Sequence, residues 1–273
     1  MSYGLTAYDF VQQVYWAQEK AILDFWPEDD KFKEVLFEAN LILQELQNVE
    51  DWTWLRDRLV LGPCQQEPGT IPEFELPDWV YQPSMLNHDC IYLHPWIPWC
   101  DKPDMMHYIT VPFASAGDNA YRRERQMSGF GPIHTPNIKL RAIRIGNTVT
   151  FNRLLMPEER CRVAIMDVQR RIEQFHICGQ DCEYQEIDGH HVCTKEIDEE
   201  GKEIKHLVQI PDPNYVVMAT AARHAEGSPH ALARVSGLQD AAQKILSAMR
   251  QNDASATDAD WQDWDIPGYY EVI

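Results

Sequence analysis

Proline is concentrated in one stretch of this sequence, and that limits what the middle of the chain can fold into. Eleven of the 17 prolines lie between residues 61 and 136. Proline lacks a backbone N–H and interrupts both helices and central strands. Residues 61–136 are therefore predicted to form short edge strands and long ordered loops, held by buried aromatic side chains. Loops of this length in a compact chain are usually functional or form interfaces.

Helical patterns occur at both ends of the chain. The sequence predicts a first helix over residues 6–26, capped by Thr6, and a second one opened by Pro27. Apolar residues of the second helix recur every three or four positions and form one stripe, as in the seam of a helix bundle: Phe32, Val35, Leu36, Ala39, Leu43 and Leu46. Residues 215–225 and 232–249 predict a second pair of helices.

Two β units are predicted between these helices. Residues 138–145 and 148–155 flank Gly146-Asn147, which is typical of a β-hairpin with a two-residue turn. A three-stranded meander is predicted over residues 181–187, 190–197 and 202–210, with Asp188-Gly189 at its first turn.

A third helix is predicted between the two β units. It would begin at Pro157 and run to about Phe175, with its apolar residues in helical register: Cys161, Ile165, Val168, Ile172 and Phe175.

These patterns together predict an α+β fold. N- and C-terminal helices would form an antiparallel helix bundle, and a large β-rich insertion would separate them. We expect residues 1–60 and 211–250 to be the two halves of the bundle. Residues 61–210 would be the insertion with its one helix, and residues 251–273 an extended C-terminal arm.

Composition and charge exclude several classes of protein. With 24 basic and 43 acidic residues the formal net charge is −19, which opposes tight binding to free nucleic acid or to an anionic membrane. There is no apolar run long enough to span a bilayer and no secretory signal at the start, so we expect a soluble protein without membrane contact. Seven dispersed cysteines favour a reducing cytosol over a disulfide framework.

Catalytic signatures are absent from the sequence. It contains no nucleophile elbow, no HExxH and no glycine-rich phosphate loop. The acidic pairs lie at predicted helix starts or in a turn, where solvated carboxylates are common, and nothing implies the burial that would separate their pKa values. We therefore do not expect an enzyme.

One group of side chains has the chemistry of a metal site. If Asp188-Gly189 is a two-residue turn, paired residues have numbers that sum to 377, and His191 shares a face with Cys182 and Cys193. Cys178 could reach this face from the end of the preceding helix. Tetrahedral zinc accepts such ligands, so Cys178, Cys182, His191 and Cys193 are a candidate zinc site. The alternatives are unmetallated sheet residues, which are the default because cysteine is a common small buried residue, and a stray disulfide.

A basic segment and an acidic aromatic tail are candidate contact surfaces. Residues 121–180 carry a net charge of +6 between acidic neighbours. The arginines in this segment could form intersubunit ion pairs, remain a solvated face, or face passing nucleic acid: Arg122, Arg123, Arg125, Arg141 and Arg144. The tail carries four aromatic residues typical of interface anchors: Trp261, Trp264, Tyr269 and Tyr270. We interpret it as an interaction arm, with a disordered terminus as the alternative.

The layout resembles the head-to-tail adaptor proteins of short-tailed bacteriophages, also called connector or tail-tubular proteins. The amphipathic helix FKEVLFEANLILQELQNVEDWTWL (32–55) ends in Trp-x-Trp and leads into a strand-like segment. Residues 210–249 resemble the family's closing pair of helices, with a packing run of small residues: Ala221, Ala222 and Ala225. About 100 of the 273 residues carry the likeness, and the insert over 61–210 departs from the smaller family members.

The resemblance implies a structural protein of the virion neck that is assembled in the host cytoplasm. It implies a homo-oligomeric ring of twelve subunits around a channel through which double-stranded DNA passes during ejection, without sequence-specific binding. The portal protein would lie above the ring, and tail nozzle or tail fibre proteins would lie below it. The family has no catalytic residues and no cofactor. The alternative function is a non-enzymatic protein-interaction module stabilised by zinc.

Overall fold

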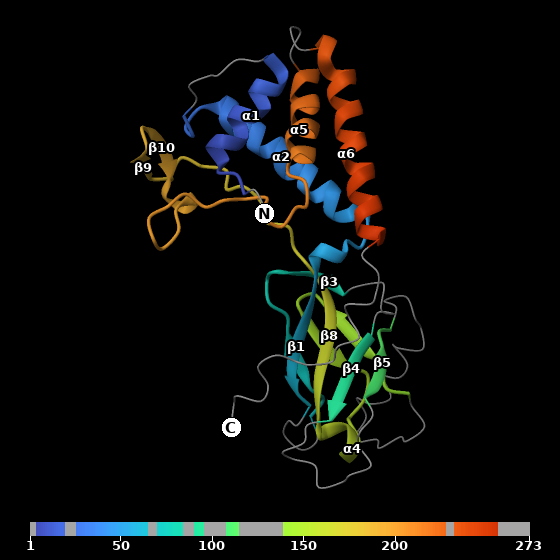
Figure 1. Ribbon diagram of the computed structural model, residues 1–273. Coiled ribbons are helices and arrows are strands. Elements are labelled where there is room, and N and C mark those ends of the chain that lie inside the picture. The colour runs from blue at the N-terminus through green and yellow to red at the C-terminus, as the bar shows by residue number, and fades with distance from the viewer. Residues whose placement is uncertain are drawn as a thin grey trace. The chain divides into compact units, whose positions relative to one another are not determined.

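The computed structural model describes residues 4–19, 26–64, 70–83, 90–95, 108–114, 139–227 and 232–255 (Figure 1). The chain divides into two compact units. The helical unit comprises Met1–Trp54 and Ile172–Ile273, and the β unit comprises Leu55–Arg171. The β unit therefore begins at Leu55 and ends at Arg171, whereas the predicted insertion ran from residue 61 to residue 210. The segment from Ile172 onward belongs with the helices.

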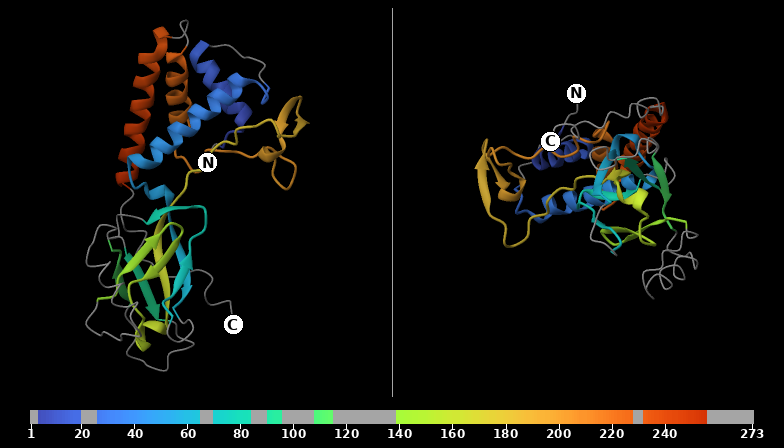
Figure 2. Two further views of the ribbon diagram at one scale, coloured as in Figure 1. Left: turned by 180° about the vertical axis from the view of Figure 1, so that it is seen from behind. Right: turned by 90° about the horizontal axis from the view of Figure 1, so that it is seen from below.

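Helices from both ends of the chain pack together in the helical unit. They are α1 (Ala7–Glu19), α2 (Asp30–Val49), α5 (Asn214–Glu226) and α6 (Val235–Ser255), with a 3-10 turn η4 (Leu232–Arg234) before α6. Helix α5 packs against each of the other three, and it lies side by side with α6 in Figures 1 and 2. The predicted α+β class, with helices from the two ends packed together and β-sheets between them in sequence, is confirmed.

The local signals that predicted these helices are present in the structure. The Thr6 hydroxyl accepts a hydrogen bond from the N–H of Asp9 at 3.1 Å and so caps α1. The apolar stripe of α2 is buried along its whole length. Beyond α2, Trp52 is fully buried and its Nε1–H donates to the carbonyl of Leu46 at 2.8 Å, which closes the end of the helix. The 3-10 turn η1 (Thr53–Leu55) follows directly.

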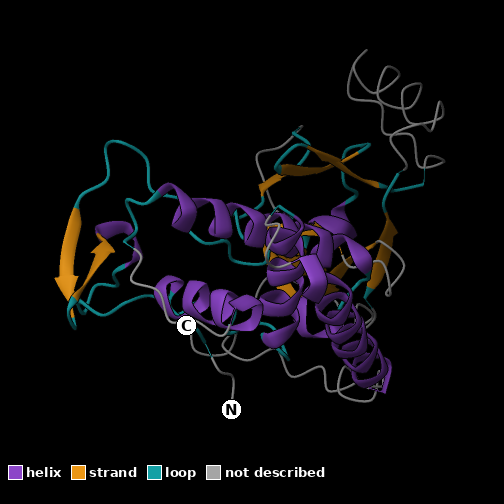
Figure 3. Ribbon diagram, turned by 90° about the horizontal axis from the view of Figure 1, so that it is seen from above, coloured by secondary structure: helices purple, strands orange, loops and turns teal. Residues whose placement is uncertain are grey.

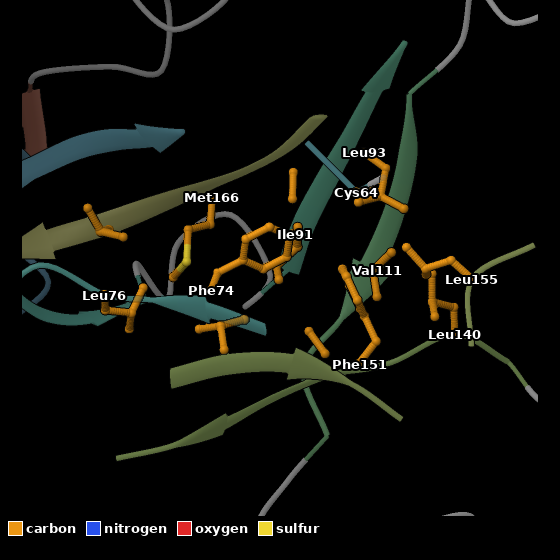
Figure 4. Close-up of a cluster of buried hydrophobic side chains, with 14 of the residues drawn as sticks. Cys64, Phe74, Leu76, Ile91, Leu93, Val111, Leu140, Phe151, Leu155 and Met166 are labelled. Atoms are coloured by element: carbon orange, nitrogen blue, oxygen red, sulfur yellow. The ribbon is translucent and has the colours of Figure 1, made fainter. Parts of the chain in front are cut away.

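The described strands of the β unit form two antiparallel sheets. The larger has the order β1 (Arg56–Pro63), β8 (Arg162–Arg170), β4 (Cys90–Pro95) and β5 (Ile109–Pro112), with β3 (Val80–Pro83) also paired to β8. The smaller has the order β2 (Glu73–Glu75), β7 (Thr148–Phe151) and β6 (Ala142–Ile145). Side chains from both sheets meet in one core, in which Phe74, Phe151 and Met166 are labelled in Figure 4. The predicted hairpin over 138–155 is confirmed as β6–β7, with Gly146 at φ +60° in its turn.

The third helix predicted from Pro157 to Phe175 is wrong. Only one turn, α4 (Pro157–Arg160), is helical, and β8 begins at Arg162. Strand β8 pairs with β1, β3 and β4, and its consecutive residues are buried from Arg162 to Gln169. A strand that is covered on both faces has a continuous apolar run, and such a run also satisfies a helical spacing.

The predicted meander is confirmed only in its first two strands. In β9 (Tyr184–Ile187) and β10 (His190–Cys193) the pairs His190–Ile187 and His191–Glu186 have the predicted register. The segment 202–210 forms isolated bridges in place of a third strand, so that part of the prediction is wrong. His206 exchanges two backbone hydrogen bonds with Leu5, so this segment pairs with the start of the chain.

Within the described ranges, no helix combines the length and apolar character that a membrane crossing requires.

Candidate metal centre

Four potential ligands converge in the helical unit, three from the segment between β8 and β9 and one from the end of β10. They are His176, Cys178, Cys182 and Cys193, and their ligand atoms all lie within 4.8 Å of one another. Three of the four are residues that the sequence singled out, and the histidine is a different one. The strand pair that carries Cys193 lies to one side of the helices in Figure 3, near the beginnings of α1 and α2.

Polar side chains of α2 position the segment that leads into this cluster. The Nδ2–H of Asn40 donates to the carbonyl of Phe175, and the Oδ1 of Asn40 accepts from the N–H of Phe175, both at 2.9 Å. Two turns further along α2, the Oε1 of Gln47 accepts from the N–H of Ile172 at 3.2 Å. Both α2 side chains are buried, and their hydrogen bonds fix the backbone of Ile172 and Phe175 just before the first ligand, His176.

The cysteines are arranged by a turn and by strand pairing. Cys182 N–H donates to the carbonyl of Gly179 at 3.4 Å, and Gly179 N–H donates to the Sγ of Cys182 at 3.2 Å. The Nε2 of His176 lies 3.6 Å from the same sulfur atom. Cys193 ends β10, where it pairs with Tyr184. The turn and the strand end therefore present their sulfur atoms to each other.

The pKa values of two thiols in the cluster are shifted in opposite directions. Burial raises the pKa of Cys178, and the adjacent Cys193 thiol raises it further. Burial acts in the same direction on Cys182, but the Gly179 N–H, the neighbouring thiols and Lys195 outweigh it and lower the pKa of Cys182. The outer thiol therefore gives up its proton more readily than the buried one.

A buried carboxylate supports the backbone around the histidine. The Oε1 of Glu196 accepts the N–H of His176 at 2.6 Å, and its Oε2 is hydrogen-bonded to the Nε2 of His206. Glu196 and His206 are both buried. Glu196 ends the 3-10 turn η3 (Thr194–Glu196), so this pair holds the turn after β10 against the segment that carries the first ligand.

His191, the predicted histidine ligand, lies elsewhere. Its Nδ1 is 3.2 Å from the Oε1 of Glu28, and its ring lies 4.5 Å from the ring of Trp26. The prediction placed His191 beside Cys193 because the two share a face of β10. It missed His176 because the predicted helix ran to residue 175. His176 and Cys178 are two residues apart, so in extended backbone they point to the same side, which is the signal that could have identified the histidine.

The predicted contact residues are only partly described by the structure. In the β unit, the Nε–H of Arg144 donates to the carbonyl of Gly146 at 3.0 Å, and its Nη1–H donates to the carbonyl of Tyr81 at 3.1 Å. Burial lowers the pKa of Arg144, with Arg171 adding to the effect. Arg141 lies in the same unit, and its N–H donates to the Oδ1 of Asn152 at 2.9 Å. Arg144 thus braces the β6–β7 turn.

The remaining predicted contact residues lie outside the described ranges: Arg122, Arg123, Arg125, Trp261, Trp264, Tyr269 and Tyr270.

No protein-family model matches this sequence, and no curated protein matches it.

Proposed function

We propose that this chain is a non-enzymatic structural protein of a short-tailed bacteriophage virion, located in the neck after assembly in the host cytoplasm. It would form a ring that joins the portal protein above to a tail nozzle or tail fibre protein below. The ring would line the channel through which double-stranded DNA passes during ejection.

The observation that carries the proposal is the exposure of two large aromatic side chains on packed helices. Trp16 in α1 is 57% exposed and Phe37 in α2 is 55% exposed, although the opposite sides of both helices are buried in the bundle. Large aromatic residues contribute strongly to protein interfaces when a partner covers them. In a ring, a neighbouring subunit would cover these two side chains.

The packing of α5 supports the same role. Ala221, Ala222 and Ala225 are almost completely buried, which allows the neighbouring helices to approach closely. These are the small residues on which the resemblance to the adaptor family rests. The bundle core therefore closes without Trp16 and Phe37, which remain exposed for contacts between subunits.

The net charge of −19 fits a conduit for DNA. Acidic walls repel the phosphate backbone, so DNA can slide past without the counterion release that drives tight binding. The proposal therefore involves contact with DNA but no sequence-specific binding.

Mass photometry of the full chain, alone and mixed with the portal protein of the same virion, tests the proposal. The double variant Trp16→Ser/Phe37→Ser should lose ring assembly at concentrations where the wild-type chain forms rings. Val208→Ser is the matched control, because Val208 is 39% exposed in the same unit but lies outside α1 and α2, and it should assemble normally. A wild-type chain that stays monomeric and does not bind the portal would rule the proposal out.

A further inference from the structure

We propose that His176, Cys178, Cys182 and Cys193 bind a structural zinc ion. The site is separate from the adaptor proposal, because metal content and ring assembly are measured independently. A chain that is monomeric and binds zinc would rule out the ring and support the metal site.

The spacing of the ligand atoms matches tetrahedral coordination. Zn–S bonds of about 2.3 Å and Zn–N bonds of about 2.0 Å place the ligand atoms of a tetrahedral site roughly 3.5–3.8 Å apart. The Nε2 of His176 and the Sγ of Cys182 are already 3.6 Å apart, and no pair in the cluster exceeds 4.8 Å. Small side-chain rotations would bring all four atoms to bonding distance of one ion.

The donor set selects the metal. Three sulfur atoms and one imidazole are soft to intermediate ligands, which suit zinc and do not suit magnesium, calcium or manganese. Four protein ligands fill a tetrahedral zinc ion completely and leave no open position for a water molecule or a substrate. The site is therefore structural and not catalytic.

Groups around the ligands favour the metal-bound form. The Gly179 N–H that donates to Cys182 would stabilise a thiolate bound to the ion. Three thiolates with one Zn²⁺ carry a net charge of −1. The positive charge of Lys195, which acts on Cys182, would offset part of it. Glu196 accepts the N–H of His176 and fixes the backbone at that ligand.

The positions of the ligands in the chain show what the ion would stabilise. His176, Cys178 and Cys182 precede β9, while Cys193 ends β10, so a bound ion would tie the start of β9 to the end of β10, at the open end of the hairpin. A two-stranded sheet is marginally stable on its own in water. Metal binding adds its free energy to folding when the site exists only in the folded chain. The ion would therefore hold the β9–β10 pair beside α2.

Metal analysis of the full chain, purified without a histidine tag and under reducing conditions, tests the proposal. We expect one zinc ion per chain, and we expect Co²⁺ to replace it with the intense visible absorption of a tetrahedral thiolate site. The thiols of Cys178, Cys182 and Cys193 should become reactive only after chelation. A protein that is folded by circular dichroism, has reduced thiols and binds neither metal overturns the proposal, and so does a disulfide within the cluster.

Matched variants test the ligand assignment. His176→Ala and Cys182→Ser should lose the stoichiometric zinc and the tetrahedral cobalt spectrum. His191→Ala and Cys161→Ser should keep both, because His191 contacts Glu28 and Cys161 lies in the β unit. Loss of the metal in His191→Ala together with its retention in His176→Ala overturns the assignment. The metal content of the wild-type chain tests the site without any variant. Misfolding of a variant therefore does not decide whether the site binds zinc.

Discussion

Asn40 in α2 and the backbone of Phe175 exchange two hydrogen bonds, each 2.9 Å long. The amide of one buried side chain thus satisfies both the donor and the acceptor of a residue that belongs to no described helix or strand. His176 follows immediately. The contact therefore connects the helix bundle directly to the candidate metal centre.

Asn40→Ala should destabilise the helical unit substantially. The substitution leaves the buried N–H and C=O of Phe175 without their partners, and each such loss costs about 1–3 kcal/mol. We expect a loss of roughly 2–4 kcal/mol in the free energy of unfolding, measured by urea titration with far-UV circular dichroism. Asn48→Ala is the control on the same helix, since the Asn48 side chain donates to Gln44 at an exposed position. Equal effects of the two substitutions would contradict the assigned role of Asn40.

Arg153→Met should destabilise the β unit. Arg153 and Glu159 form a two-bond ion pair at 2.8 Å, and their side chains are only 7% and 8% exposed. Removing the cation leaves a buried carboxylate without its counter-charge, which costs about 3–5 kcal/mol. Lys202→Met removes the cation of the exposed Lys202–Glu200 pair and should cost less than about 1 kcal/mol. Thermal unfolding of the two variants measures the difference, and a stable Arg153→Met protein would refute this account.

The stability of the helical unit should fall as the pH rises from about 4.5 to 7. Burial, with Glu34 and Glu226 adding to it and Arg223 opposing it, raises the pKa of Glu38 from its ordinary 4.5 to about 7. The folded state then binds more protons than the unfolded state between about pH 4.5 and 7, so the contribution of Glu38 declines across that range as pH increases.

Glu38→Gln should flatten this pH dependence and raise the stability above pH 7. The Oε2 of Glu38 is buried without a hydrogen-bond partner among the described residues, which is why the charged form is unfavourable. Glu173→Gln is the control, because Glu173 is exposed in the same unit. Melting temperatures between pH 5 and 8 measure the effect. An unchanged slope in Glu38→Gln would show that another group titrates.

Local patterns in the sequence were sufficient to predict the four helices of the bundle and the hairpin registers, because caps, apolar stripes and two-residue turns involve neighbouring residues. Strand β8 could not be predicted in this way. It is an inner strand that pairs with β1, β3 and β4, and its consecutive residues from Arg162 to Gln169 are buried. The spacing of its apolar residues fits a helix equally well. The choice of His176 over His191 likewise depends on the contacts of Phe175 with Asn40, which are distant in sequence.

Removal of residues 256–273 should abolish portal binding and leave the fold intact. Helix α6 continues to Ser255, into the range predicted as arm, and Asp253 accepts the N–H of Thr53 at 3.0 Å. A truncation before residue 251 would therefore disturb the bundle as well. Binding to the portal protein, measured by co-sedimentation, should be lost while the circular dichroism spectrum keeps its helical signal. Normal binding of the truncated chain would eliminate the arm as the portal anchor.

The mass of the complex between the full chain and the portal protein tests the adaptor role most directly. Mass photometry should show a discrete species whose added mass corresponds to a closed ring. The resemblance implies twelve copies in this ring. A negative-stain image of that species should show a central channel. A portal ring whose mass is unchanged by a molar excess of the full, folded chain would contradict the adaptor role.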